Sequence, residues 1–249
     1  MVAVIRTHLK ACVNMKFHQY RVLGFIEVIP WSMADYLNVS RGFEPQRDPG
    51  DLHYYGQIPA LNDCVYRYMY RSKYVALHDM DELILPQTVD SWRELLPLLE
   101  LNYGVDFCYK FENYVFPNTF KLPPPTPQPR HHLPEKCCPS WQSVSGVNIL
   151  EHLYHEPDNF MRYSNHKIIV NPRVVFAPTV HGVLKSEKGC TWVHKSFARM
   201  YHTRPPALRD LTADQLVYDD RLLGYSARLI LAVNAVLQKA GLIQEESTQ

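Results

Sequence analysis

The sequence lacks the features that define several large classes of protein. Its most apolar long stretch, residues 227–237, is interrupted by Arg228 and Asn234 and is too short to cross a bilayer. Its 26 Lys and Arg residues nearly balance its 25 Asp and Glu residues, and no basic run provides a stripe that could follow a phosphate backbone. We therefore expect no nucleic-acid partner.

Glycine is scarce, and so are the motifs built from it. With 10 glycines in 249 residues there is no Gly-x-Gly-x-x-Gly fingerprint, no Walker loop and no nucleophile-elbow serine. These absences exclude the usual dinucleotide-binding, ATPase and serine-hydrolase interpretations. The six cysteines are too few and too scattered to define a disulfide framework. Four of them could be buried thiols or lumenal disulfides: Cys12, Cys64, Cys108 and Cys190.

What the sequence does contain is an apolar segment that ends in a dense group of acids. Residues 74–78 read Tyr-Val-Ala-Leu-His, and Asp79, Asp81 and Glu82 follow within four positions. Because side chains alternate along a strand, Asp79 and Asp81 are predicted to point the same way at its exit. Two converging carboxylates provide the hard oxygen ligands that Mn²⁺ and Mg²⁺ prefer, and these ions hold phosphates.

An Asp-x-Asp triplet alone is a weak signal, because such triplets are common in solvated loops and at helix N-caps. Here the acids lie between the apolar strand and a second apolar segment, residues 83–85. Acids between apolar flanks are costly unless a cation neutralises them. The context therefore favours a metal site, in which Glu82 is expected to orient the loop.

A metal cage of this kind needs further ligands, and imidazole nitrogen suits Mn²⁺. His181 is placed in a turn after a predicted strand, and His202 follows Tyr201. With twelve histidines in the chain, any single one is more often a hydrogen-bonded structural residue than a ligand. His181 is preferred because its place at a strand end resembles that of the acidic motif.

Apolar periodicity predicts an α/β fold in a single domain over residues 1–249. Strands are expected at 22–29, 74–78 and 105–116, helices at 59–71 and 91–101, and a strand pair bent at Pro172 over 168–175. This alternation predicts a mainly parallel sheet flanked by helices, with ligands beyond the carboxyl ends of the strands.

Two later segments differ from this pattern. Residues 117–142 are rich in proline and predict a stiff surface loop, which is either a lid or an excursion without function. Residues 212–215 match a capping box, and leucines and valines follow at roughly helical spacing up to Val236. Gly241 is a plausible stop for this C-terminal helix.

The blocks at residues 60–67 and 73–86 resemble those of glycosyltransferase family 92. Residues 166–172, the pair Val180-His181 and residues 201–204 resemble further blocks of that family in the same order, so that the likeness covers most of residues 20–205. The resemblance implies a GT-A fold, a UDP-sugar donor (UDP-galactose in characterised members), Mn²⁺, and transfer to a glycan hydroxyl with inversion.

Carried over by position, the resemblance assigns roles to particular residues. Asp79 and Asp81 would coordinate Mn²⁺ on the donor diphosphate, with His181 as the third ligand and His202 as second choice. Asp63 and Arg67, on the preceding helix, would either contact the donor or serve packing. Inversion needs a carboxylate base, and nothing in the sequence chooses among the three candidates: Glu112, Glu156 and Asp158.

The family's members are typically single-pass Golgi proteins that face the lumen, so we expect a membrane-anchored full-length form acting on glycans or glycoproteins. Only about twenty residues precede the strand at Gly24, fewer than in the family. We therefore expect an N-terminally truncated domain that lacks the first nucleotide-binding strands.

Two alternatives remain open. One is an inactive remnant of such an enzyme that acts at most as a binding protein. The other is an Asp-x-Asp phosphohydrolase similar to the haloacid dehalogenases. That class needs Thr or Val two residues after the second Asp, where this chain has Leu83.

Overall fold

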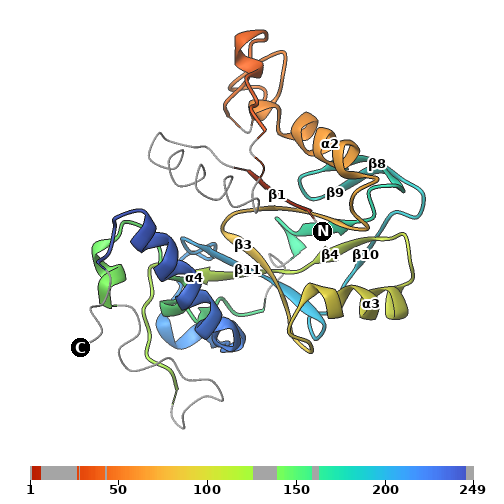
Figure 1. Ribbon diagram of the computed structural model, residues 1–249. Coiled ribbons are helices and arrows are strands. Elements are labelled where there is room, and N and C mark those ends of the chain that lie inside the picture. The colour runs from red at the N-terminus through yellow and green to blue at the C-terminus, as the bar shows by residue number, and fades with distance from the viewer. Residues whose placement is uncertain are drawn as a thin grey trace.

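The computed structural model describes residues 2–6, 27, 29–42, 44–125, 139–158 and 163–244. At its centre lies a five-stranded sheet in the spatial order β1-β2-β7-β4-β10 (Figure 1). Its strands are β1 (Val2–Arg6), β2 (Val75–Asp79), β7 (Lys167–Val170), β4 (Cys108–Phe111) and β10 (Cys190–Trp192).

The central sheet is mixed. β1 is parallel to β2 and β10 is parallel to β4, but β7 is antiparallel to both of its neighbours, β2 and β4. The predicted mainly parallel sheet is therefore wrong, because a strand from late in the sequence enters the middle of the sheet in reverse. β1 is also a strand that the periodicity does not predict. The carboxyl ends of β1, β2, β4 and β10 still lie at one edge, together with the start of β7.

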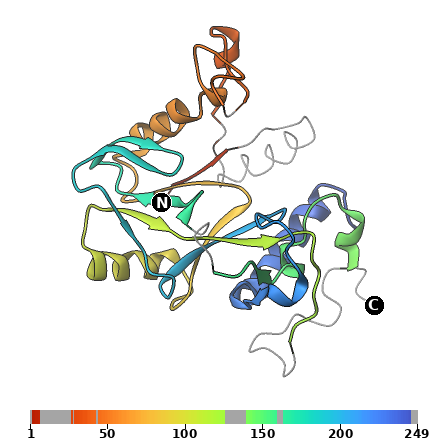
Figure 2. The same ribbon diagram turned by 180° about the vertical axis from the view of Figure 1, so that it is seen from behind.

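Helices α2 (Gln57–Tyr68) and α3 (Trp92–Tyr103) cover opposite faces of this sheet (Figures 1 and 2). Alternation along β2 explains the arrangement, because Val75 and Leu77 pack with α2 whereas Ala76 packs with α3. Both helices confirm the sequence prediction to within a few residues. Their buried side chains are Leu61, Cys64, Val65 and Tyr68 of α2 and Leu95, Leu96 and Leu99 of α3.

A second sheet of three strands continues from the first. Its order is β3-β11-β5, with β3 (Glu82–Pro86), β11 (Ala198–Arg204) and β5 (Asn113–Pro117). The chain passes from the first sheet to the second between β2 and β3, between β4 and β5, and between β10 and β11. The single strand predicted at 105–116 is therefore two strands, which separate at Glu112.

Smaller elements complete the fold. β8 (Val175–Thr179) and β9 (Gly182–Ser186) form a hairpin that turns at residues 180–181, and β6 (Tyr154–His155) pairs with β12 (Val217–Tyr218). The strand pair predicted over 168–175 is wrong, because residues 168–170 belong to β7 of the central sheet whereas Val175 begins β8 in a separate sheet. The short 3₁₀ helices are η1 (Met33–Asp35), η2 (Tyr54–Gly56), η3 (Pro139–Ser143), η4 (Ile149–Glu151), η6 (Ala213–Gln215) and η7 (Arg221–Tyr225).

The C-terminal helix α4 (Ser226–Lys239) packs beside the second sheet. It begins later than the spacing predicts. The predicted capping box forms, but it caps the N-terminus of the short helix η6, and the chain then pairs as β12 with β6 before α4 begins. Its predicted stop is confirmed. Gly241 has a φ of 65°, and the N–H of Leu242 donates to the carbonyl of Leu237 at 2.9 Å, as in a Schellman motif.

Two predicted segments lie partly outside the described residues. Of the strand expected at 22–29, only Glu27 and Ile29 are described, and neither is in a strand. In the predicted loop 117–142, residues 118–125 are irregular as expected, but the loop's end forms η3. There the Trp141 indole N–H donates to Asn234 of α4 at 2.6 Å. Across the described ranges, none of the helices combines the length and apolar character needed to span a membrane.

A disulfide joins β4 to β10. Cys108 and Cys190 stand opposite each other in the parallel register and are bonded, which closes a loop with a sequence separation of 82. For these two residues the structure decides between thiol and disulfide, which the sequence left open. Cys64 is a buried free thiol, and burial raises its pKa to about 12. Cys12 lies outside the described residues.

We expect loss of this disulfide to destabilise the fold, because the cross-link restricts the unfolded chain. Replacement of both Cys108 and Cys190 by Ala should lower the free energy of unfolding in urea by about 2–5 kcal/mol. Adding a reductant should destabilise the wild-type protein and leave the double variant unchanged. An equal response of the two proteins to reductant would contradict the pairing.

Candidate active site

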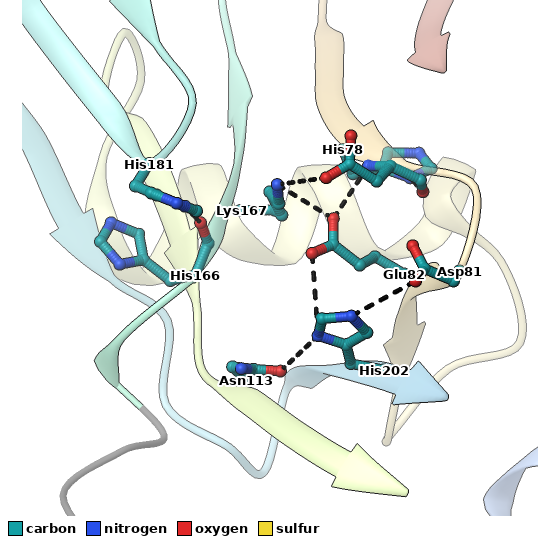
Figure 3. Close-up of polar contacts among 9 residues, drawn as sticks. His78, Asp81, Glu82, Asn113, His166, Lys167, His181 and His202 are labelled. Atoms are coloured by element: carbon teal, nitrogen blue, oxygen red, sulfur yellow. Dashed lines mark hydrogen bonds and ion pairs between the residues drawn. The ribbon is translucent and has the colours of Figure 1, made fainter. Parts of the chain in front are cut away.

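The acidic motif lies at the edge of the central sheet where the chain crosses into the second sheet. Asp79 ends β2, and Met80 and Asp81 turn the chain into β3, which begins at Glu82. Lys167 opens the neighbouring strand β7. The predicted strand before the motif is thus confirmed, and Figure 3 shows that side chains from β2, β3, β5, β7 and β11 meet at this point.

Lys167 provides a buried positive charge inside the motif. Its ammonium lies 2.9 Å from Oδ2 of Asp79 and 3.2 Å from Oε2 of Glu82, and the side chains of Lys167 and Glu82 are each 3% exposed. The same oxygen of Glu82 accepts a hydrogen bond from the Asp79 N–H at 2.8 Å. Burial raises the pKa of Glu82, and the nearby ammonium opposes that rise. Lys167 therefore supplies part of the positive charge that the three acids of the motif require.

Asp81 lies on the more exposed side of the motif and faces β11. Its side chain is 55% exposed, and its Oδ2 is 3.5 Å from Nε2 of the nearly buried His202. The other ring nitrogen of His202, Nδ1, faces Oδ1 of Asn113 at 3.2 Å and Oε1 of Glu82 at 3.8 Å (Figure 3). The contact with His202 lowers the pKa of Asp81, which keeps the carboxylate ionised. Asp79 and Asp81 thus have different partners.

His181 lies on the opposite side of Lys167 from His202 (Figure 3). Its Nδ1 is 2.8 Å from the carbonyl oxygen of His166. Because that oxygen can only accept, Nδ1 carries the proton and Nε2 of the neutral ring keeps its lone pair. Burial lowers the pKa of His181, Lys167 lowers it further and Asp79 raises it, so the ring is within electrostatic reach of the Lys167–Asp79 pair.

A small pocket lined by both polar and apolar residues adjoins the motif through Asn113, the residue that contacts His202. Two of the three predicted base candidates stand on its wall. One of them, Asp158, has a side chain that is 40% exposed and forms an ion pair with Lys195 at 2.5 Å. The lining includes Asn113, Tyr114, Glu156, Asp158, Ser164 and Arg204.

The other two base candidates are buried and engaged. Glu156 lines the pocket, but its Oε1 accepts hydrogen bonds from the backbone N–H groups of residues 207 and 208 at 2.5 and 3.2 Å. Glu112 is 6% exposed and accepts a hydrogen bond from the hydroxyl of Tyr114 at 3.2 Å. Both carboxylates therefore hold parts of the fold together in this arrangement.

Asp63 and Arg67, the two predicted donor contacts, bind each other on the surface of α2. The guanidinium of Arg67 makes two hydrogen bonds to the carboxylate of Asp63, at 2.9 and 3.0 Å. The helix itself is tied to β8 by Asn62 and Tyr66, whose side chains donate to backbone carbonyls. The pair has the spacing of a helix-stabilising ion pair. A role in donor binding stays a prediction.

Comparison with known proteins identifies the family. The family model described as glycosyltransferase family 92 matches residues 13–222, most of the chain. The chain belongs to glycosyltransferase family 92. A family 92 protein of Caenorhabditis elegans is 31% identical over 74 residues, which is 29% of this chain and 14% of that relative. The segment of likeness is thus a small part of that relative's length.

The acidic motif of this family 92 chain can be tested for its fit to a divalent cation. Within the ranges that the structure describes, no three His, Cys, Asp or Glu side chains form a ready-made metal site. Asp81 and His202 nevertheless place a carboxylate oxygen and a ring nitrogen 3.5 Å apart. If Nδ1 of His202 donates to Asn113, these two atoms are facing acceptors, and only a proton or a cation relieves their repulsion. Mg²⁺ and Mn²⁺ often take one or two protein ligands and complete their shell with phosphate and water. The pair therefore fits such an ion.

Sequence reasoning missed two residues of this site, Lys167 and Asn113. Lys167 carries a usable signal, because a lysine that opens the apolar run Ile168-Ile169-Val170 must find an acid if the strand is buried. Asn113 carries none. It is an ordinary polar residue in sequence, and only the break between β4 and β5 turns it toward His202.

Replacement of Lys167 should test whether the buried ion pairs hold the motif together. Lys167→Met leaves Asp79 and Glu82 without their cation, and should cost about 3–5 kcal/mol of unfolding free energy. The matched control is Lys188→Met, whose side chain is 44% exposed and whose loss should cost less than about 1 kcal/mol. Adding Glu82→Gln to Lys167→Met should recover part of the loss. Equal urea midpoints for the two single variants would contradict the buried network.

Proposed function

We propose that this protein transfers a hexose, in the first place galactose, from a UDP-sugar to a hydroxyl group of a glycan, with inversion and with Mn²⁺. The observation that carries the proposal is the half-exposed Asp81 beside His202, at the strand-end edge of an α/β sheet and next to a small pocket. Family membership supports sugar transfer. The choice of galactose, manganese and inversion rests on the resemblance alone.

In this reaction, the residues of the motif have different electrostatic roles. Asp81 and His202 would hold the cation, which when bound stabilises the negative charge that develops on the departing diphosphate. Lys167 contacts both Asp79 and Glu82 and sets one positive charge against their two negative charges, which reduces the repulsion that an anionic donor meets at the site. Glu82 also lies beside Nδ1 of His202 and helps to fix the ring.

Asp158 is the base that we propose for the acceptor hydroxyl. Among the three candidates it alone combines a position on the pocket wall with a substantially exposed carboxylate. Glu156 is held by two backbone N–H groups and Glu112 is buried against Tyr114. A general base must reach the proton that it removes, and exposure to the pocket gives Asp158 that reach.

Asp81→Asn should abolish transfer while the fold is kept. The change removes a carboxylate charge at a half-exposed position, so the unfolding free energy should stay within about 0.5 kcal/mol of the wild-type value. UDP release from UDP-galactose should require Mn²⁺ in the wild-type protein and be lost in the variant, with the exposed Asp35→Asn as control. Full activity after removal of Mn²⁺ by a chelator would contradict the proposed metal requirement. Absence of saturable UDP binding would favour the remnant, and phosphate release from an aryl phosphate would favour the phosphohydrolase.

Asp158→Asn should reduce kcat and leave donor binding intact. Loss of a general base typically costs about 10²- to 10⁴-fold in rate. The control Asp214→Asn, at an exposed position, should keep the wild-type kcat. A normal kcat in Asp158→Asn would remove Asp158 from the mechanism.

We also propose that the full-length protein is membrane-anchored and faces the Golgi lumen. The disulfide between Cys108 and Cys190 supports this placement, because structural disulfides persist in secretory compartments and are rare in the cytosol. Residues 38–40 form an N-glycosylation acceptor triplet, and the side chain that would carry the glycan, Asn38, is exposed. A full-length protein that keeps Cys108 and Cys190 reduced in its own cell would contradict the placement.

A further inference from the structure

Arg204, at the end of β11, brings to the pocket a positive charge that has no counterpart there. It lines the pocket together with Glu156 and Asp158. Each of those acids is already compensated, Glu156 by backbone N–H groups and Asp158 by Lys195. Throughout the described residues, the guanidinium of Arg204 has no hydrogen bond or ion pair. A guanidinium without a partner, beside carboxylates that already have theirs, is suited to bind an anion.

The register of the second sheet places Arg204 in line with the metal-binding candidates. His202 and Arg204 are two residues apart on β11, so they share one face of the strand and are separated by about 6–7 Å along it. Asn113 of β5 contacts His202 on this face. Tyr201, the residue before His202, belongs to the other face of the strand and packs with Phe116 in the core.

The face therefore presents two anion-attracting positions in a row. The first is the Asp81–His202 pair, through the cation that it would hold. The second is the guanidinium of Arg204, whose planar fork matches a phosphate group with two parallel hydrogen bonds. The pocket connects them through Asn113, which lines it and contacts His202.

We propose that Arg204 binds the diphosphate of the sugar-nucleotide donor directly. The inference rests on the proposed function and adds to it a second phosphate contact that belongs to the protein itself. Arg204 then holds the donor by charge-assisted hydrogen bonds and keeps its share of the diphosphate charge compensated as the sugar departs. The nucleoside is outside its reach in this role, so affinity for a ligand without phosphate does not depend on it.

The test measures binding by calorimetry in the presence of Mn²⁺, with UDP and uridine as the probes. Arg204→Gln should weaken UDP binding by about 10- to 100-fold and change uridine binding less than twofold. Arg204→Lys keeps the positive charge but not the planar guanidinium, so its affinity for UDP should lie between those of the wild type and Arg204→Gln. The matched control is Arg93→Gln, on the exposed surface of α3, which should bind UDP as the wild type does.

The outcomes separate this inference from the proposed function. If the wild type binds UDP and Arg204→Gln binds it equally well, the Arg204 contact is wrong and the proposed transferase stands. The contact is also wrong if Arg204→Gln leaves UDP affinity unchanged but raises the KM for an acidic acceptor glycan, because the anion is then on the acceptor. If the wild type itself does not bind UDP, the proposed function is wrong, and so is the Arg204 contact that rests on it.

Discussion

The site depends on one buried lysine. Lys167 enters the centre of the acidic motif, and its buried ammonium contacts the partly exposed Asp79 and the buried Glu82. Without that charge, the two carboxylates would repel each other, and Glu82 would be buried without a cation. With it, Glu82 can also bond the backbone N–H of Asp79 and thereby fix the turn that carries Asp81.

The lysine reaches this place because β7 runs against its neighbours. A reversed strand between β2 and β4 brings its first residue, rather than its last, to the edge where those two strands end. At the same edge the chain passes into the second sheet, so β11 places His202 beside Asp81. The mixed topology that contradicts the parallel-sheet prediction is therefore also what assembles the motif.

This arrangement separates structural charges from available ones. Lys167 and Glu82 satisfy each other in the interior, and Glu156 is bound to backbone N–H groups. The groups left toward solvent are Asp81 with its imidazole partner, the partly exposed Asp158, and Arg204. Under the proposed function these three groups would serve as the cation site, the base and the anion contact for transfer from a nucleotide diphosphate.

The sequence by itself determined the two helices that flank the central sheet, the strand that ends at the acidic motif, and the family. These follow from local periodicity and from contiguous blocks of residues, which need no knowledge of distant contacts. Tertiary structure alone decided the direction of β7, the division of residues 105–116 into two strands, and the partner of each charge. Lys167 and Asp79 are 88 positions apart in sequence, and no local pattern encodes a contact whose free energy comes from joint burial in the folded chain.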